Sequence, residues 1–141
     1  MKKWIDYIWA GCGCLIVNDD NQILLLSHNK FDWAWSQPGW SIEFGEDIES
    51  AIKREIKEEL WVEIELFWPK TYAETIETKK WKKRHWLVWG RFAKIISWEP
   101  KNMEPEKHAE IKRFDLDDLP ENITAFTKPY IEGYKKRKKW K

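Results

Sequence analysis

Glu55, Glu58 and Glu59 are the residues of this chain whose types and spacing are best suited to chemistry. They lie in the run REIKEE, inside a stretch of strong helix formers that follows Asp47, a residue that suits a helix N-cap. At about 100° per residue, with Ile48 set to zero, Glu55 and Glu59 fall at roughly −20° and +20°. The apolar arc of the same helix starts at Ile48, so these two glutamates border its buried side.

Clustered carboxylates repel one another, and burying one of them unpaired costs several kcal/mol, roughly. A divalent cation removes both penalties. A set of oxygen ligands suits Mg²⁺, with Mn²⁺ as an alternative, and Mg²⁺ commonly joins protein carboxylates to substrate phosphates. The helix alone leaves a second interpretation open, in which it is a charged amphipathic helix whose glutamates pair with Lys and Arg.

The residues around these glutamates resemble the Nudix box, G-x(5)-E-x(7)-R-E-U-x-E-E-x-G-U, where U is a bulky aliphatic residue. The match lies within 39–62 and consists of Glu46, Arg54, Glu55, Ile56, Glu58, Glu59 and Val62. The Nudix family cleaves nucleoside diphosphates that are linked to another moiety. The resemblance implies that the three glutamates hold Mg²⁺ together with the backbone carbonyl of Gly39. It also implies that Arg54 pairs with Glu46 and braces the loop against the helix.

Two positions depart from the box, and both are tryptophan. Trp40 replaces the opening glycine, and Trp61 replaces the glycine after the helix, where a left-handed residue is usual. The chain has 12 Trp and only 6 Gly. Four more tryptophans stand where turns favour glycine: Trp33, Trp68, Trp81 and Trp98.

We hypothesise that some of these tryptophans are glycines in the functional protein. A codon that the source organism reads as Gly, translated here as Trp, would produce this pattern. The alternative is a Trp-rich protein that uses aromatic side chains as platforms for nucleobases.

The segment EPKNMEPEK, at 99–107, is a second informative region. Together with the acidic-Leu-Pro turn at 117–120, it resembles the Nudix subgroup that hydrolyses nucleoside triphosphates, including purine and modified-purine forms. Glu106 is our candidate for a further carboxylate from this loop, and a solvated acidic loop is the alternative.

The reaction we expect is Mg²⁺-dependent hydrolysis of a phosphoanhydride bond in a nucleoside triphosphate, which gives the monophosphate and pyrophosphate. Glu58, Glu59 and Glu106 are the candidate catalytic residues, with Glu58 or Glu106 as the general base. Trp35 and His85 are candidate substrate contacts, although core packing accounts for Trp35 equally well and a strand-end position accounts for His85 more simply.

Two other functions stay open. The first keeps the chemistry but changes the substrate to a dinucleoside polyphosphate, a nucleotide sugar or a capped RNA. The second is a nucleotide-binding Nudix module whose catalysis is impaired by Trp40 and Trp61.

The pattern of the rest of the chain predicts the elements that position these residues. Strands are expected at 10–17, 23–27, 62–77, 84–97 and 109–115, and helices at 47–60 and about 122–137. With the resemblance, this order predicts an α/β protein with the Nudix fold, a mixed β-sheet sandwiched between helices.

Length and composition predict a single domain, 1–141, with enough apolar residues for a core, since 43% of the chain is hydrophobic. No apolar run approaches the roughly 18 residues of a membrane span, and we see no signal peptide, so we expect a cytoplasmic protein without a membrane partner. The net charge of +1 does not by itself predict nucleic-acid binding. We expect a small-molecule nucleotide as the partner and no stable nucleic-acid partner. The oligomeric state stays open, with a homodimer as one expectation. Cys12 and Cys14 are expected to be buried free thiols.

Overall fold

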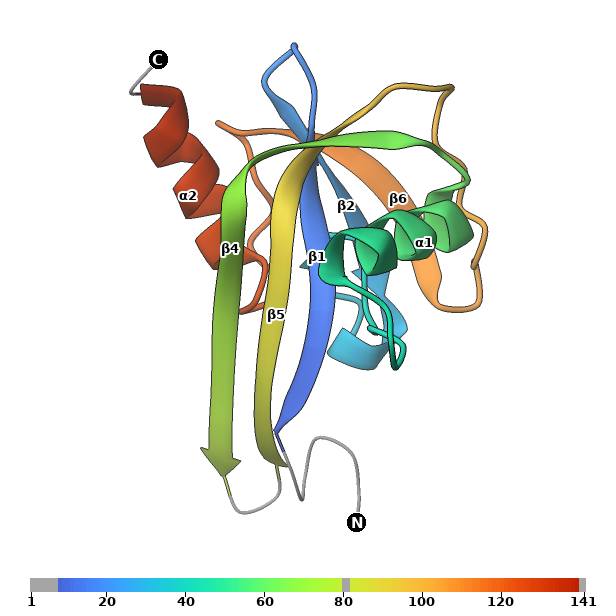
Figure 1. Ribbon diagram of the computed structural model, residues 1–141. Coiled ribbons are helices and arrows are strands. Elements are labelled where there is room, and N and C mark those ends of the chain that lie inside the picture. The colour runs from blue at the N-terminus through green and yellow to red at the C-terminus, as the bar shows by residue number, and fades with distance from the viewer. Residues whose placement is uncertain (1–7, 80–81, 140–141) are drawn as a thin grey trace.

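The protein is built on a mixed β-sheet with two α-helices, in a computed structural model that describes residues 8–79 and 82–139 (Figure 1). The elements in chain order are β1 (Trp9–Val17), β2 (Gln22–His28), the 3-10 turn η1 (Asn29–Phe31), β3 (Trp35–Ser36), α1 (Ile48–Leu60), β4 (Ile64–Lys79), β5 (Lys82–Ile95), β6 (His108–Asp115) and α2 (Lys128–Lys139). Trp81, one of the tryptophans expected at a turn, lies outside the described residues.

Strand β1 sets the topology of the sheet. It pairs in parallel with β5 along almost its whole length, but it pairs with β2 only at its carboxyl end, where Ile16 lies opposite Leu24 and Val17 opposite Ile23. Strand β2 also pairs antiparallel with β3 and β6, and β5 pairs antiparallel with β4. The sheet is therefore mixed, as predicted, and β1 and β2 diverge toward one end.

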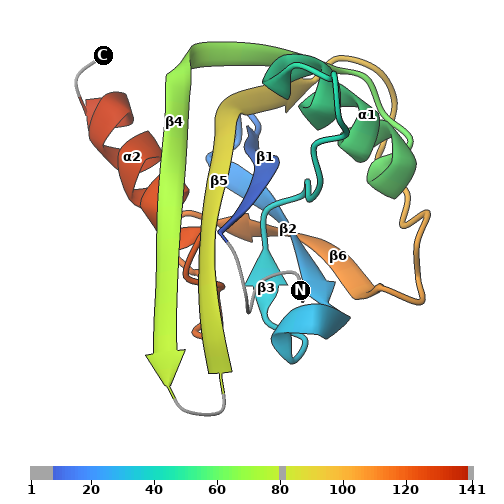
Figure 2. The ribbon, with the colours of Figure 1, turned by 60° about the horizontal axis from the view of Figure 1, so that its bottom comes forward.

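The segment after β3 fills the place where β1 and β2 diverge. Figure 2 shows the connection from β3 to α1 running along the sheet beside β1. Cys12 N–H donates to Trp40 O at 3.0 Å, and Cys14 N–H donates to Pro38 O at 3.2 Å. These two hydrogen bonds fix the start of the loop that leads to α1.

Alternate residues of β1 serve two cores on opposite faces of the sheet. Leu15 packs in one core with Tyr130 of α2, whereas Cys14 packs in the other with Ile52 and Ile56 of α1. Figures 1 and 2 show the two helices on different sides of the sheet. The predicted α/β fold, a mixed sheet between helices, is thus confirmed. No helix in the described part of the chain is long and apolar enough to cross a membrane.

The last helix begins later than predicted, at Lys128 rather than at about residue 122. Trp35 N–H donates to Asn122 O at 2.8 Å, and Thr124 N–H donates to Trp35 O at 2.9 Å. This pairing holds the segment extended beside β3. Pro129 then suits the first helical turn, where no backbone donor is needed.

Cys12 and Cys14 are both free and buried, as predicted. Burial raises the pKa of the Cys12 thiol to about 12, and burial likewise holds the pKa of Cys14 well above its usual value. Both thiols are therefore protonated at neutral pH and serve as small apolar core residues.

Candidate active site

Helix α1 carries the three glutamates, and both of its ends are fixed. The Asp47 carboxylate accepts a backbone N–H of the first turn at 2.8 Å, and Trp61 N–H donates to Lys57 O at 3.0 Å at the other end. Because the isoleucines of α1 pack on the sheet, the neighbouring Glu55 and Glu59 are buried with them, at 6% and 4% exposure. The predicted border position of these two glutamates is confirmed.

Glu59 is held by the loop that docks on β1. Gly39 N–H donates to Glu59 Oε1 at 2.8 Å. Gly39 has a φ of 115°, and a Cβ there would lie 2.5 Å from the carbonyl oxygen of Cys12, so this position requires glycine. The resemblance assigned the Gly39 carbonyl to the metal, whereas the contact observed here is made by its N–H. Ligation by the carbonyl stays a prediction.

The electrostatic environment of Glu59 favours a positive partner. Burial, followed by the charge of Glu55, raises the pKa of Glu59 to about 8. A carboxyl in such a position holds either a proton or a cation. The observation fits the divalent ion that the spacing of the glutamates suggested.

Arg54 braces the loop against α1, as the resemblance implied. Its Nε donates to Glu46 Oε2 at 2.8 Å and its Nη2 donates to Glu46 Oε1 at 3.0 Å, a two-pronged pair. Nη2 also donates to Ser41 O at 2.9 Å. The Arg54 hydrogen bonds hold the pKa of Glu46 at about 2, and Glu46 in turn raises the pKa of Arg54 above its usual value.

Glu55 and Glu58 form a second group around Arg54. Glu55 Oε1 accepts the N–H of Ser41 at 3.0 Å and its hydroxyl at 2.9 Å. Glu58 is about half exposed, and both of its carboxylate oxygens lie 3.3 Å from Arg54 Nη1. Glu58 is thus the box carboxylate that solvent reaches most readily, because Glu55 and Glu59 are buried.

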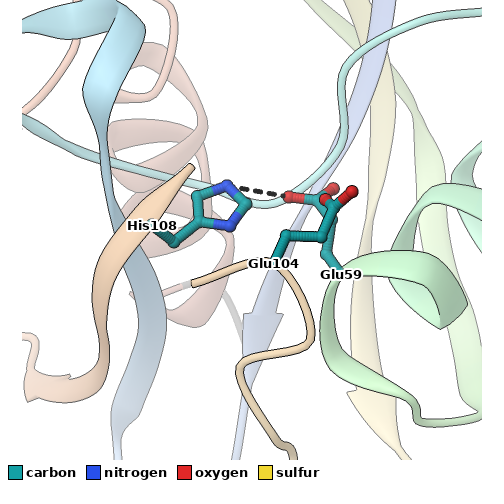
Figure 3. Close-up of side chains that lie close together, drawn as sticks. All are labelled: Glu59, Glu104 and His108. Carbon is teal, nitrogen blue, oxygen red and sulfur yellow. Dashed lines mark ion pairs between the residues drawn. The ribbon is translucent and has the colours of Figure 1, made fainter. Parts of the chain in front are cut away.

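A further carboxylate comes from the segment before β6, and a histidine is the first residue of β6. Glu104 and His108 approach Glu59, and one ligand atom of each of the three residues lies within 4.8 Å of the others (Figure 3). His108 Nε2 is 3.4 Å from Glu59 Oε2, and Lys107 Nζ donates to Glu104 Oε2 at 3.1 Å. The segment is tied to the end of α1, since Met103 N–H donates to Glu59 O at 3.0 Å.

Glu106, our sequence candidate from this loop, lies outside that group. Its side chain is exposed, and its backbone oxygen accepts from Asn29 Nδ2 at 3.2 Å. His108 N–H donates to Glu104 O at 3.0 Å, so one helical turn places Glu104 and His108 on the same side. The spacing of four residues between a carboxylate and a histidine was the signal that sequence reasoning missed.

Two adjacent pockets lie near the glutamates of α1. The first, which we call the acidic pocket, has a volume of about 170 Å³ and is lined by Glu55, Glu58, Glu59, Glu104, His108 and the cations Lys30, Arg54 and Lys107, among others. The second, the aromatic pocket, has a volume of about 190 Å³ and is lined by Phe31, Trp86 and Phe126 with polar groups around them. Lys30 lines both pockets. The acidic pocket offers oxygen donors for a cation and ammonium and guanidinium groups for an anion.

Trp40 stands between the two pockets. Its side chain lines the acidic pocket, and its ring lies 5.3 Å from Phe31 and 6.1 Å from Trp86 of the aromatic pocket, centroid to centroid. Trp40 is not among the described non-glycine residues with positive φ. The backbone at this position therefore accepts a side chain, and the effect of Trp40 is to occupy space.

Trp61 and Trp33 differ from Trp40, because their backbones are left-handed. Trp61 has φ 59° and ψ 44°, and Trp33 has φ 64°. A left-handed residue at position 61 is what the box predicts for its glycine. These two positions support the glycine hypothesis, which depends on the codons for its proof.

The two predicted substrate contacts lie elsewhere. Trp35 packs edge-on against Phe114 with centroids 4.8 Å apart, and His85 Nε2 is 2.9 Å from Glu74 across β4 and β5. Neither residue is among those that line the acidic or the aromatic pocket. Their roles in substrate binding stay predictions.

Comparisons with known proteins identify the family and the fold of this chain. A family model described as NUDIX domain matches residues 9–134. The ADP-ribose pyrophosphatase of Methanocaldococcus jannaschii is 46% identical over 46 residues, which are 31% of this chain and 27% of that protein, so the match spans about a quarter of the relative. A solved MutT NUDIX hydrolase from Burkholderia pseudomallei is 32% identical, with a TM-score of 0.77 over 90% of this chain and 98% of that one. The MutT protein from Methanosarcina mazei Go1 shares the fold, with a TM-score of 0.72 at 17% identity over 99% of both chains.

Proposed function

This chain belongs to the NUDIX domain family, and from that premise we propose that it hydrolyses a phosphoanhydride bond of a nucleoside triphosphate to give the monophosphate and pyrophosphate. The observation that carries the proposal is the acidic pocket beside the aromatic pocket. A polyphosphate needs cations and cation-binding carboxylates, and a base needs aromatic surface. The two pockets supply these in neighbouring places.

The donors present fit a divalent cation. Glu55, Glu58 and Glu59 would hold Mg²⁺, and a bound cation would offset the burial and the neighbouring Glu55 charge that raise the pKa of Glu59. When bound, Mg²⁺ supplies neutralisation of the phosphate charge and lowers the pKa of a bound water. Mn²⁺ suits the same oxygens.

Glu58 is the general base that the geometry favours. It lines the acidic pocket and is half exposed, so a water molecule can reach its carboxylate. In the reaction, the water oxygen forms a new bond to the α phosphorus and the water proton passes to Glu58. The bond between the α phosphorus and the oxygen that bridges to the β phosphoryl group breaks. Pyrophosphate then leaves with the electron pair of that bond. Glu106 stays the alternative base that the sequence suggested.

Three cations of the acidic pocket would position the phosphates. Lys30 and Lys107 line the pocket from two different segments, η1 and the loop before β6, and Arg54 lines it from α1. Arg54 is already committed to Glu46, so it contributes a fixed charge rather than a mobile side chain. Binding and orientation by these groups supply part of the rate acceleration.

A second candidate substrate is a nucleoside diphosphate linked to another moiety. The observation that favours it is the 46% identity with a protein named ADP-ribose pyrophosphatase, which extends over 31% of this chain. The third candidate is a nucleotide-binding module without catalysis, which the position of Trp40 between the pockets favours.

The test is pyrophosphate release from a panel of nucleoside triphosphates with Mg²⁺. A parallel assay measures the phosphate monoesters that form when ADP-ribose is hydrolysed. Four proteins are compared: the parent, Trp40→Gly/Trp61→Gly, Glu59→Gln, and the three substitutions combined. We expect the double variant to release pyrophosphate and Glu59→Gln to reduce that release at least about 100-fold. Turnover of ADP-ribose alone would transfer the proposal to the second candidate. No turnover of any substrate would leave a binding module.

A further inference from the structure

Glu59, Glu104 and His108 meet at one point of the acidic pocket, although they come from α1, from the segment before β6 and from the start of β6. Figure 3 shows the imidazole of His108 facing the carboxylates of Glu59 and Glu104. One ligand atom of each residue lies within 4.8 Å of the other two, and the His108 Nε2 to Glu59 Oε2 distance is 3.4 Å. Two ligands that bind one ion at about 2.1 Å are about 3 Å apart at right angles. The 3.4 Å separation is thus close to that of two neighbouring ligands of a shared ion.

His108 is a buried polar side chain whose ring nitrogens make no hydrogen bond with the described residues. It is 1% exposed. Its ring packs edge-on against His28, with centroids 4.8 Å apart. A buried polar group without a hydrogen bond is destabilising, so the position of His108 beside two carboxylates points to a ligand.

The contacts of Glu59 leave one of its carboxylate oxygens directed at His108. Glu59 Oε1 is occupied by Gly39 N–H, whereas Oε2 is the oxygen that faces His108. Glu55 and Glu58 contact Arg54, and neither belongs to the group of three ligand atoms.

We infer that Glu59, Glu104 and His108 form a mixed oxygen-and-nitrogen cation site, in which His108 is a direct ligand of a divalent transition ion such as Mn²⁺. An imidazole ligand favours Mn²⁺, Co²⁺ or Zn²⁺ over Mg²⁺, which prefers oxygen. The inference rests on the proposed function, because both use Glu59 as a ligand. It adds a nitrogen ligand, His108, to a site whose other ligands are carboxylate oxygens.

Pulsed electron paramagnetic resonance of the full chain loaded with Mn²⁺ tests the inference. A directly bound imidazole gives a ¹⁴N modulation, which we expect in the parent protein and not in His108→Gln. His28→Gln is the matched control, because His28 lies against His108 but does not belong to the three-residue group. The ¹⁴N signal should persist in that variant. Equilibrium binding should show an affinity for Mn²⁺ about tenfold weaker in His108→Gln, with a smaller loss for Mg²⁺.

Labelling keeps the test independent of folding of the variants. In the parent protein grown with ¹⁵N-histidine, the modulation should change to that of ¹⁵N. Mn²⁺ that binds without any nitrogen coupling would overturn the inference and leave the proposed hydrolysis intact, because carboxylates alone would then hold the ion. Absence of Mn²⁺ binding would also overturn it. Failure of the proposed function is read separately, from pyrophosphate release with Mg²⁺.

Discussion

Trp61 is a large side chain on a backbone that suits glycine. Its φ of 59° and ψ of 44° cost an L-residue about 1–2 kcal/mol. The residue is 46% exposed, with Lys57 Nζ 4.7 Å from the ring centroid, so little packing offsets this cost. We expect Trp61→Gly to raise the free energy of unfolding by about 1 kcal/mol, measured by urea denaturation.

The control for this prediction is Trp61→Ala, which removes the same ring but keeps Cβ. It should be less stable than the glycine variant, and an alanine variant of equal or greater stability would contradict the strain argument. Trp33, with a φ of 64°, offers an independent repeat. The gene tests the origin of these residues: ordinary tryptophan codons at positions 40 and 61, rather than a reassigned stop codon, would defeat the glycine hypothesis.

Glu59 makes the stability of the metal-free protein depend on pH. In the folded state its pKa is about 8, above the ordinary value of 4.5, so the folded state binds the proton more tightly. The contribution of Glu59 to the free energy of unfolding is therefore complete below about pH 4.5 and is lost as the pH rises through 8. His28 acts in the opposite sense, because burial and the neighbouring His108 lower its pKa to about 4, and its contribution is lost as the pH falls from about 6.5 to 4.

Glu59→Gln should therefore stabilise the metal-free protein at high pH. Glutamine keeps the shape and the acceptor for Gly39 N–H, but it carries no charge. With a chelator present, we expect the variant to exceed the parent by on the order of 2 kcal/mol at pH 9 and to match it near pH 4.5. Chemical denaturation at the two pH values measures this. A difference that grows toward low pH would refute the assigned cause.

At the scale of the elements, α1 was the most predictable part of the molecule. The period of its isoleucines and the Asp47 cap fixed both its ends and the border position of Glu55 and Glu59. The segment before β6 was less predictable, because it has no regular period. The segment carries carboxylates at both Glu104 and Glu106. A single turn, closed by the hydrogen bond from His108 N–H to Glu104 O, directs Glu104 and not Glu106 toward Glu59.

The loop between β3 and α1 determines whether the two pockets communicate. Trp40 lies there with its ring among Trp9, Phe31 and Trp86. We expect Trp40→Gly to join the acidic and aromatic pockets and to lower KM for a nucleoside triphosphate, measured by steady-state kinetics. The lost packing should lower the free energy of unfolding by about 1–3 kcal/mol.

Trp40→Phe is the matched control for this loop. Phenylalanine keeps an aromatic ring in the same place, so KM should stay close to that of the parent. A fall in KM with phenylalanine as large as that with glycine would show that Trp40 does not separate the pockets.

At the scale of the whole molecule, the site depends on contacts between distant parts of the chain. The divergence of β1 from β2 lets the segment at 38–40 dock on β1, and the pairing of β2 with β6 brings His108 beside His28. Such pairings follow from tertiary packing rather than local propensity, so the sequence predicted the strands but not which side chains meet. The same limit explains the late start of α2, whose expected first turn is used beside β3.

The most direct test of the proposed hydrolysis is ³¹P NMR of the products formed from a nucleoside triphosphate with Mg²⁺ by Trp40→Gly/Trp61→Gly. We predict nucleoside monophosphate and pyrophosphate in equal amounts, with the rate lost when Glu59→Gln is added. Formation of nucleoside diphosphate and orthophosphate, or a rate that Glu59→Gln leaves unchanged, would contradict the proposal that the carboxylates of α1 carry out pyrophosphate release.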